Sequence, residues 1–252
     1  MYTIIYFSPT GNTKHLAREL GTKLSLEGSK VIELDTIKSY DLEKDEHLIF
    51  MTPIHGFNAP RTVKRFVKNM PAGLYKRISI ITVGCNTIWV NDAVSLELKK
   101  KFIKKGYEIV VDKVLAMPLT FIMNFPEETK VKMIEESTTE ISSIANEIMQ
   151  NQQSNKKVKM KSKMITFIGK AEDPAARLFG LELHGTKACT SCGICWNNCP
   201  ENNIKKGAKG KPKFGLSCMM CMKCIYKCPE DAITPYISKF IPIKGGYSIN
   251  NK

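Results

Sequence analysis

The chain has 252 residues, of which 43% are hydrophobic and 25% charged, so it can form one domain of ordinary size and a small second one. No apolar run approaches the roughly eighteen residues that a membrane-spanning helix needs, which excludes a helical integral membrane protein. The net charge of +14 is uneven: residues 1–150 carry 20 Lys and Arg against 18 Asp and Glu, whereas residues 151–252 carry 18 against 6.

The chain begins with a short apolar segment, residues 2–7, that is typical of a buried parallel strand. A polar loop, residues 8–13, follows it and leads into a pattern of apolar residues with helical spacing. A helix that starts after such a loop presents its backbone N–H groups and its positive dipole end to an anion. The alternative is an ordinary capped helix start. The candidate anion-binding residues of this first loop are Ser8, Thr10, Gly11, Asn12 and Thr13.

Strand and helix patterns alternate over the next hundred residues. The segments with strand character are 31–34, 47–51, 78–83 and 108–115, and helical patterns lie between most of them. This alternation predicts an α/β fold, a doubly wound parallel sheet with helices on both faces. In such a sheet the ligand binds at the carboxyl ends of the strands, where the strand order reverses. The chain contains no G-x-G-x-x-G dinucleotide motif.

Two further loops lie at the same predicted edge of the sheet. The second loop consists of Thr52, Pro53, Ile54, His55, Gly56, Phe57 and Asn58. The third loop includes Gly84, Cys85, Asn86 and Trp89. Together with Ser-Pro-Thr-Gly-Asn-Thr in the first loop, this arrangement resembles the flavodoxins. The resemblance implies FMN, with its phosphate on the first loop and its ring between the second and third.

Single residues of the second and third loops have two interpretations each. The resemblance makes Phe57 and Trp89 candidates for stacking on the flavin ring, although loop aromatics also serve as core plugs. His55 could hydrogen-bond the flavin or face solvent. Cys85, which no cluster needs, is interpreted as a small loop residue in preference to a redox partner. Residues 117–126, rich in apolar side chains, could cover the flavin, face the next domain or simply pack.

Eight of the nine cysteines lie in two copies of the pattern C-x-x-C-x-x-C-x-x-x-C-P. This spacing is that of the bacterial two-cluster ferredoxins, in which the fourth cysteine of each run ligates the other cluster. The resemblance implies two [4Fe–4S] clusters in a small α+β domain. The first ligand set would be Cys189, Cys192, Cys195 and Cys228. The second would be Cys218, Cys221, Cys224 and Cys199.

Zinc and disulfides are the alternatives for these cysteines. Zinc would leave ligands idle, because structural sites use four ligands and no histidine alternates with the cysteines here. A disulfide framework suits exported proteins, and the first residues lack the features of a signal peptide. We therefore expect reduced cysteines and a cytoplasmic location.

The whole chain resembles the flavodoxin–ferredoxin fusion proteins of anaerobic bacteria and archaea. We expect a flavodoxin-like domain at 1–150, a basic linker with a short connecting helix at 151–183, a ferredoxin domain at 184–236 and a tail at 237–252. The resemblance implies an electron carrier in which clusters and FMN exchange electrons. Its partner would be a redox protein, and the basic second half would suit an acidic one.

Two other functions remain open at this point. The first is a flavin-dependent reductase of a quinone-type or tetrapyrrole-type substrate, with the clusters delivering the electrons. Whether the protein is an enzyme is therefore open. The second is a redox sensor bound to nucleic acid, which we do not favour because the lysines are not interleaved with aromatic stacking residues.

Overall fold

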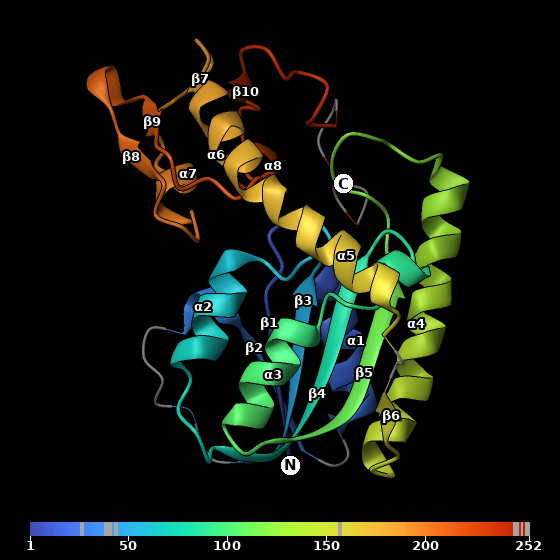
Figure 1. Cartoon of the computed structure of the whole chain (residues 1–252). Helices are drawn as coiled ribbons and strands as arrows, with labels where there is room; N and C mark the ends of the chain where they lie inside the picture. Colours follow the sequence, from blue (N-terminus) through green and yellow to red (C-terminus); the bar gives the residue numbers. More distant parts are fainter. Residues whose placement is uncertain are drawn as a thin grey trace. The chain divides into compact units, whose positions relative to one another are not determined.

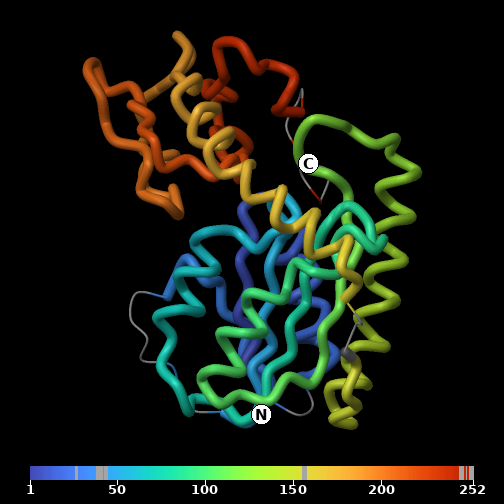
Figure 2. Tube along the Cα trace, in the orientation of Figure 1, coloured from blue at the N-terminus to red at the C-terminus, as the bar shows by residue number. Residues whose placement is uncertain are grey.

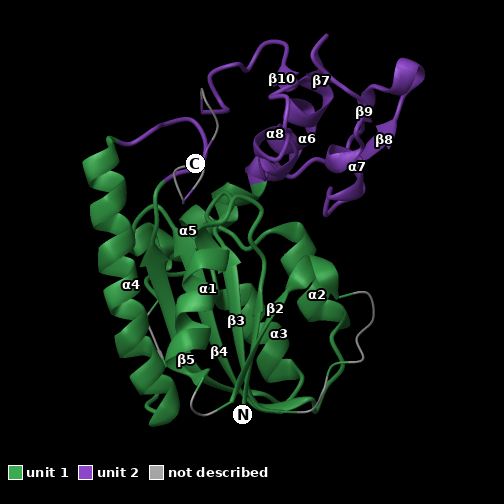
Figure 3. Ribbon diagram, turned by 180° about the vertical axis from the view of Figure 1, so that it is seen from behind, with its two compact units in different colours: residues 1–118, 126–170 green, residues 119–125, 171–252 purple. Residues whose placement is uncertain are grey.

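The computed structural model describes residues 1–25, 28–37, 42, 45–155, 158–243, 247 and 249. The chain divides into two compact units, which Figure 3 colours separately. The first unit contains residues 1–118 and 126–170, and the second contains residues 119–125 and 171–252. Parts of the expected linker (156–157) and tail (244–246, 248 and 250–252) lie outside the described residues. Within the described residues, no helix is long and apolar enough to cross a membrane.

A parallel sheet forms the centre of the first unit (Figure 1), with the strand order β2-β1-β3-β4-β5-β6. Its strands are β1 (Tyr2–Tyr6), β2 (Ser29–Glu33), β3 (Asp45–Pro53), β4 (Tyr75–Gly84), β5 (Glu108–Ala116) and β6 (Ser154–Asn155). Every neighbouring pair runs parallel. The strand order reverses at β1, which pairs with β2 on one side and β3 on the other. This confirms the doubly wound fold.

Helices cover both faces of this sheet. Helices α1 (Asn12–Lys23) and α4 (Glu127–Met149) lie on one face, and α2 (Arg61–Asn69) and α3 (Leu96–Lys104) lie on the other (Figures 1 and 3). The central strands are apolar on both sides for this reason, and residues 48–51 of β3 are fully buried. On α1, Leu16 and Leu20 are one turn apart and both fully buried. Burial of such a side chain contributes about 1.5–3 kcal/mol to folding.

The segment after α4, which we expected to join the domains, adds two elements to the first unit. Strand β6 extends the sheet beside β5. Helix α5 (Met160–Ile168) follows and lies across the carboxyl ends of the strands, where Figure 2 shows it in yellow. The short 3-10 segments are η2 (Leu34–Thr36), η3 (Trp89–Asn91), η4 (Gly169–Ala171) and, in the second unit, η5 (Ala208–Gly210).

The second unit is a small α+β fold with an internal duplication, as predicted. Strands β7 (Leu183–Gly185) and β10 (Ile233–Pro235) pair antiparallel, and so do β8 (Ile204–Lys206) and β9 (Pro212–Phe214). Its helices are α6 (Glu172–Glu182), α7 (Ile194–Asn197) and α8 (Lys223–Tyr226). The backbone repeats residues of positive φ at equal offsets in the two cysteine runs. These pairs are Ser191 and Met220, Gly193 and Met222, and Asn202 and Asp231.

Candidate functional site

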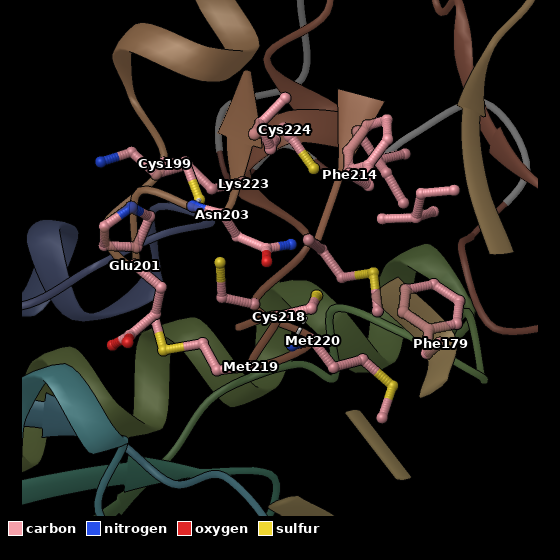
Figure 4. A pocket seen from close by; sticks show the side chains of 16 residues that line it. Phe179, Cys199, Glu201, Asn203, Phe214, Cys218, Met219, Met220, Lys223 and Cys224 are labelled. Atoms are coloured by element: carbon pink, nitrogen blue, oxygen red, sulfur yellow. Dashed lines mark hydrogen bonds between the residues drawn. The ribbon is translucent and has the colours of Figure 1, made fainter. Parts of the chain in front are cut away.

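The clustered cysteines line two cavities of the second unit, four in each. One cavity has an empty volume of about 430 Å³, including space open to solvent, and Figure 4 labels Cys199, Cys218 and Cys224 among the side chains that line it. Its cysteines are Cys218, Cys221, Cys224 and Cys199. The other cavity, of about 330 Å³, is lined by Cys189, Cys192, Cys195 and Cys228. The structure thus brings together the two sets that the ferredoxin resemblance implies.

The cysteines surround a volume in each case, and they do not converge on a point. Among the described residues, no group of three or more His, Cys, Asp or Glu side chains could hold a single metal ion. A cluster of several iron and sulfide ions needs such a wider cage of thiolates. The chemistry of the donor set therefore fits a [4Fe–4S] cluster in each cavity.

Backbone N–H groups point at several cysteine sulfurs. The N–H of Asn203 donates to Cys199 Sγ at 3.3 Å, and the N–H of Ala232 donates to Cys228 Sγ at 3.2 Å. Both donors lie four residues after their cysteine, so the two halves of the duplication repeat this bond. Such bonds stabilise negative sulfur and are one of the factors that set cluster potentials.

Burial makes several of these thiols hard to ionise in the protein alone. It raises the pKa of Cys221 to about 12, and it raises the pKa of Cys195 and, to a larger extent, of Cys224. Nearby thiols such as Cys218 add to the shift of Cys221 and Cys224 in the same direction. Because only the thiolate binds metal, the positive charge of bound iron has to drive deprotonation, and binding releases protons.

The two cavities differ in their surroundings. Cys192 of the smaller cavity is exposed to solvent. The larger cavity is walled by buried methionines, Met219 and Met222, and by Lys223, whose residue surface is only 4% exposed. Solvent access and nearby charge both tune the potential of an iron–sulfur cluster. The geometry thus predicts two clusters with unequal potentials.

In the first unit, the first loop has the geometry of an anion site. Gly11 precedes α1 with a φ of 110°, a left-handed conformation that favours glycine. The N–H of Lys14 donates to Ser8 Oγ at 2.9 Å, and the side-chain amide of Asn12 donates to the Pro118 carbonyl at 2.8 Å. Thr13 is 1% exposed, and its N–H has no acceptor among the described residues. A helix start with an unpaired N–H fits a phosphate.

The second loop forms a tight turn at its tip. The N–H groups of His55 and Asn58 donate to each other's carbonyl oxygens, both at 2.8 Å. Between them, Gly56 and Phe57 have φ values of 49° and 57°, as in a type I′ turn. A bulky residue rarely adopts this conformation, and such strained residues cluster at functional sites. The Phe57 side chain is 41% exposed, so it is not a core plug.

His55 is half-buried, and burial lowers its pKa to about 4. Its ring is therefore neutral at pH 7 and can offer one donor and one acceptor. Thr52, by contrast, is fully buried on β3, and its hydroxyl donates to the Pro53 carbonyl at 3.1 Å. Thr52 therefore belongs to the buried part of β3 and not to the loop at the carboxyl end of the sheet.

The third loop packs against the second. A Cβ at Gly84 would lie 2.8 Å from Ile54 Cδ1, so only glycine allows this approach without a shift. The side-chain amide of Asn91 donates to the carbonyl of Asn86 at 2.9 Å and to its Oδ1 at 3.0 Å. Cys85 Sγ accepts a hydrogen bond from Asn86 Nδ2 at 3.3 Å, which agrees with a loop role.

Helix α5 supplies contacts to both of these loops that the sequence did not indicate. The Ser162 hydroxyl donates to the Trp89 carbonyl at 2.7 Å, and Lys161 Nζ lies 4.6 Å from the centre of the Trp89 ring. Asn58 Nδ2 donates to the carbonyl of Thr166 at 2.8 Å. No motif marks these residues. The signal that could have pointed to them is Ser162, a small polar residue between Lys161 and Lys163.

Comparison with known proteins agrees with this division of the sites. A model of the flavodoxin domain matches residues 3–140, and a model of the 4Fe-4S dicluster domain matches residues 182–229. The ferredoxin-type protein NapF of Escherichia coli K12 is 36% identical over 59 residues, which cover 22% of this chain and 36% of NapF. The chain therefore spans little more than a third of the length of the curated relatives it matches.

Among solved structures, a Fusobacterium nucleatum flavodoxin bound to flavin mononucleotide has 16% identity and a TM-score of 0.42, over 60% of this chain and 98% of that one. An archaeal flavodoxin has 15% identity and a TM-score of 0.38, over 58% and 99%. Because the flavodoxin model matches more than half of the chain, the protein belongs to the flavodoxin domain family, and it carries a C-terminal 4Fe-4S dicluster ferredoxin domain.

Proposed function

We propose that the protein is an electron-transfer iron–sulfur flavoprotein that passes electrons between two [4Fe–4S] clusters and FMN within one chain. The observation that carries the proposal is the sorting of eight cysteines into two cavities, each with three thiols of one run and the fourth of the other. Flavodoxin and ferredoxin domains both imply electron transfer, and the flavodoxin family supports FMN as the third centre.

The first loop would hold the FMN phosphate through Thr10, Gly11 and Thr13, and one helix N-terminus provides for one phosphate. Phe57 and Trp89 would flank the ring. When bound, the clusters supply one-electron transfer and FMN stores two electrons, which come from an external reduced redox protein and are joined by two protons from solvent. The eight thiolates fix the clusters, and the buried methionines of the larger cavity exclude water from one of them.

No observation favours the reductase alternative. It would need residues 117–126 to cover a substrate pocket beside the flavin. In the structure, residues 119–125 belong to the second unit and are bonded within it. Tyr226 Oη donates to the Thr120 carbonyl at 2.5 Å, and Ile122 N–H donates to the Ile241 carbonyl at 2.6 Å. The carrier function is the one that both domains support, and we propose it for this reason.

Anaerobic purification tests the proposal directly. We expect about eight iron and eight sulfide ions per chain for two clusters, together with one FMN that is released on denaturation. The variant with Thr10→Ala and Thr13→Ala should lose flavin and keep both clusters, since each hydroxyl contributes about 1.5–3 kcal/mol to a charged acceptor. Thr22→Ala with Thr139→Ala is the matched control, because these exposed hydroxyls bond carbonyls of their own helices.

Three results would contradict the proposal. If the purified protein contained zinc and no sulfide, it would hold no iron–sulfur clusters. If reconstitution with excess FMN left no bound flavin, FMN would not be the third redox centre. Finally, the rate of flavin reduction after rapid mixing with an electron donor should not depend on protein concentration, and a rate proportional to concentration would mean transfer between molecules.

A further inference from the structure

We propose, building on the function above, that helix α5 is a positioning element of the flavin site that holds the second and third loops in place before flavin binds. The helix lies outside residues 3–140, which the flavodoxin model matches. It comes from the lysine-rich segment between the two domains. Yet it is hydrogen-bonded to both loops that would enclose the flavin ring.

The contacts to the third loop come from two adjacent residues of α5. Ser162 is completely buried, and its hydroxyl donates to the Trp89 carbonyl at 2.7 Å. Lys161 places its ammonium 4.6 Å from the centre of the Trp89 ring, a cation–π distance. One turn of helix therefore restrains both the backbone and the side chain of the residue that we expect to flank the flavin.

The contacts to the second loop come from the C-terminal end of α5. The carbonyl of Thr166 lies in the last turn, where no helical N–H is available to it, and it accepts a hydrogen bond from Asn58 Nδ2 at 2.8 Å. The same amide donates to the Gly56 carbonyl at 3.1 Å. Asn58 thus connects the left-handed turn to the end of the helix.

Gly169, just after the helix, permits this approach. A Cβ at Gly169 would lie 1.9 Å from the carbonyl oxygen of Gly56, a distance that real Cβ atoms do not show. The φ of Gly169 is −58° and its ψ is −16°, so the backbone itself accepts any residue. Glycine is needed at this position only for the contact with the loop.

The composition of the two faces of α5 supports a positioning role. The polar contacts with the loops come from Ser162 and Thr166 of the helix, and Gly169 follows directly after it. The outward side carries Met160, which is 78% exposed, and Phe167, which is 70% exposed. The helix is thus attached through directed hydrogen bonds and close backbone contact. Such an attachment fixes loop geometry and reduces the ordering cost that flavin binding would otherwise carry.

Two substitutions test the proposal, each with a matched control. Gly169→Ala raises helix propensity but forces the helix off the Gly56 carbonyl, and Ser162→Ala removes one buried hydrogen bond. We expect the FMN dissociation constant to rise about three- to tenfold in Ser162→Ala, and further in Gly169→Ala. The controls are Ser143→Ala, at an exposed serine of α4, and Lys170→Ala, at the exposed neighbour of Gly169. Fluorescence titration of the full chain measures the constants.

Hydrogen exchange of the flavin-free protein supplies a second readout. Both variants should exchange faster in peptides covering residues 52–58 and 84–91, with unchanged protection in the central strands. General destabilisation would instead raise exchange throughout the sheet. The cluster content of each preparation, measured as iron and sulfide, should equal that of the wild type.

The outcomes separate this proposal from the function on which it rests. A wild-type protein that binds no FMN overturns the proposed flavin function and the positioning role with it. A wild type that binds FMN, with variants that bind as tightly as their controls and loops that exchange no faster, overturns the positioning role alone. Tighter FMN binding in the variants would also overturn it, because α5 would then compete with the flavin.

Discussion

His47 is a buried histidine of β3 that should make the free energy of unfolding depend on pH. It is 2% exposed, and its Nε2 is hydrogen-bonded with Ser79 Oγ on β4 at 2.8 Å. Burial lowers its pKa to about 4, the positive charge of Arg77 acts in the same direction, and Asp45 opposes it. The folded protein therefore keeps this ring neutral where the unfolded chain protonates it.

The free energy of unfolding should consequently fall as pH falls below the unfolded pKa of about 6.5. Since the folded state binds fewer protons in this window, we expect His47 to account for a loss of about 1 kcal/mol between pH 7.5 and pH 5.5. Urea unfolding followed by circular dichroism measures this. His47→Gln should flatten the dependence. His55 is shifted in the same direction and should contribute separately, whereas His184→Gln serves as the control. An unchanged slope in His47→Gln would contradict the prediction.

At the scale of residues, the sequence predicted the features that depend on the spacing of residues along the chain, such as the cysteine sets. Three thiols at spacing three can line one cavity, and the resemblance to two-cluster ferredoxins implied that the fourth thiol comes from the other run, as both cavities show. The conformation of Phe57 could not be predicted, since a bulky residue with a φ of 57° goes against its intrinsic preference. The burial that lowers the pKa of His55 could not be predicted either, because it depends on how the folded chain packs around this loop.

At the scale of elements, α6 packs directly on the loop that begins the second cysteine run. A Cβ at Gly180 would lie 2.3 Å from the Cβ of Cys218. Gly180 is buried, and the residue after it, Leu181, is 50% exposed. The position of Cys218, and with it one cavity, therefore depends on a helix that supplies no ligand.

Gly180→Ala should therefore lose one cluster and keep the other. The added methyl group displaces Cys218 but leaves the cavity of Cys189 untouched, so iron should fall from about eight to about four per chain. Iron and sulfide analysis, with electron paramagnetic resonance of the reduced protein, measures the loss. Leu181→Ala on the same helix should retain both clusters. Retention of eight iron ions in Gly180→Ala would contradict the prediction, because the loop would then shift without losing the cluster.

The sequence predicted the elements of the sheet well and missed α5. Strands β1, β3, β4 and β5 have the apolar runs typical of buried parallel strands, so their positions were predicted to within a few residues. In α5 the usual pattern is inverted, because large apolar residues such as Met164 and Phe167 are exposed while the polar Ser162 is completely buried. A periodicity argument assigns such a helix to solvent or to a linker.

At the scale of the whole molecule, charge is concentrated in the C-terminal part. Residues 151–252 carry 18 Lys and Arg against 6 Asp and Glu. Each oxidised four-thiolate cluster would remove about two charges, which still leaves this part basic. Several of the lysines are exposed on or between β8 and β9, among them Lys205 and Lys209. Such a surface accelerates encounter with an acidic partner, and salt screens the effect.

Electron transfer to an acidic acceptor protein should therefore slow by roughly tenfold or more as salt rises from low to physiological levels. A basic acceptor of similar potential should show the opposite trend. Replacing Lys205 and Lys209 by glutamate should reduce the rate with the acidic acceptor at low salt. Replacing Lys68 and Lys100 by glutamate changes the net charge equally but alters exposed positions of the first unit.

If both double variants slowed the reaction equally, net charge would control encounter. If neither did, the lysines beside the clusters would serve only solubility and compensation of the cluster charge. Stopped-flow kinetics over a series of salt concentrations distinguishes these cases, because local docking requires that only the first pair lowers both the rate and its salt dependence.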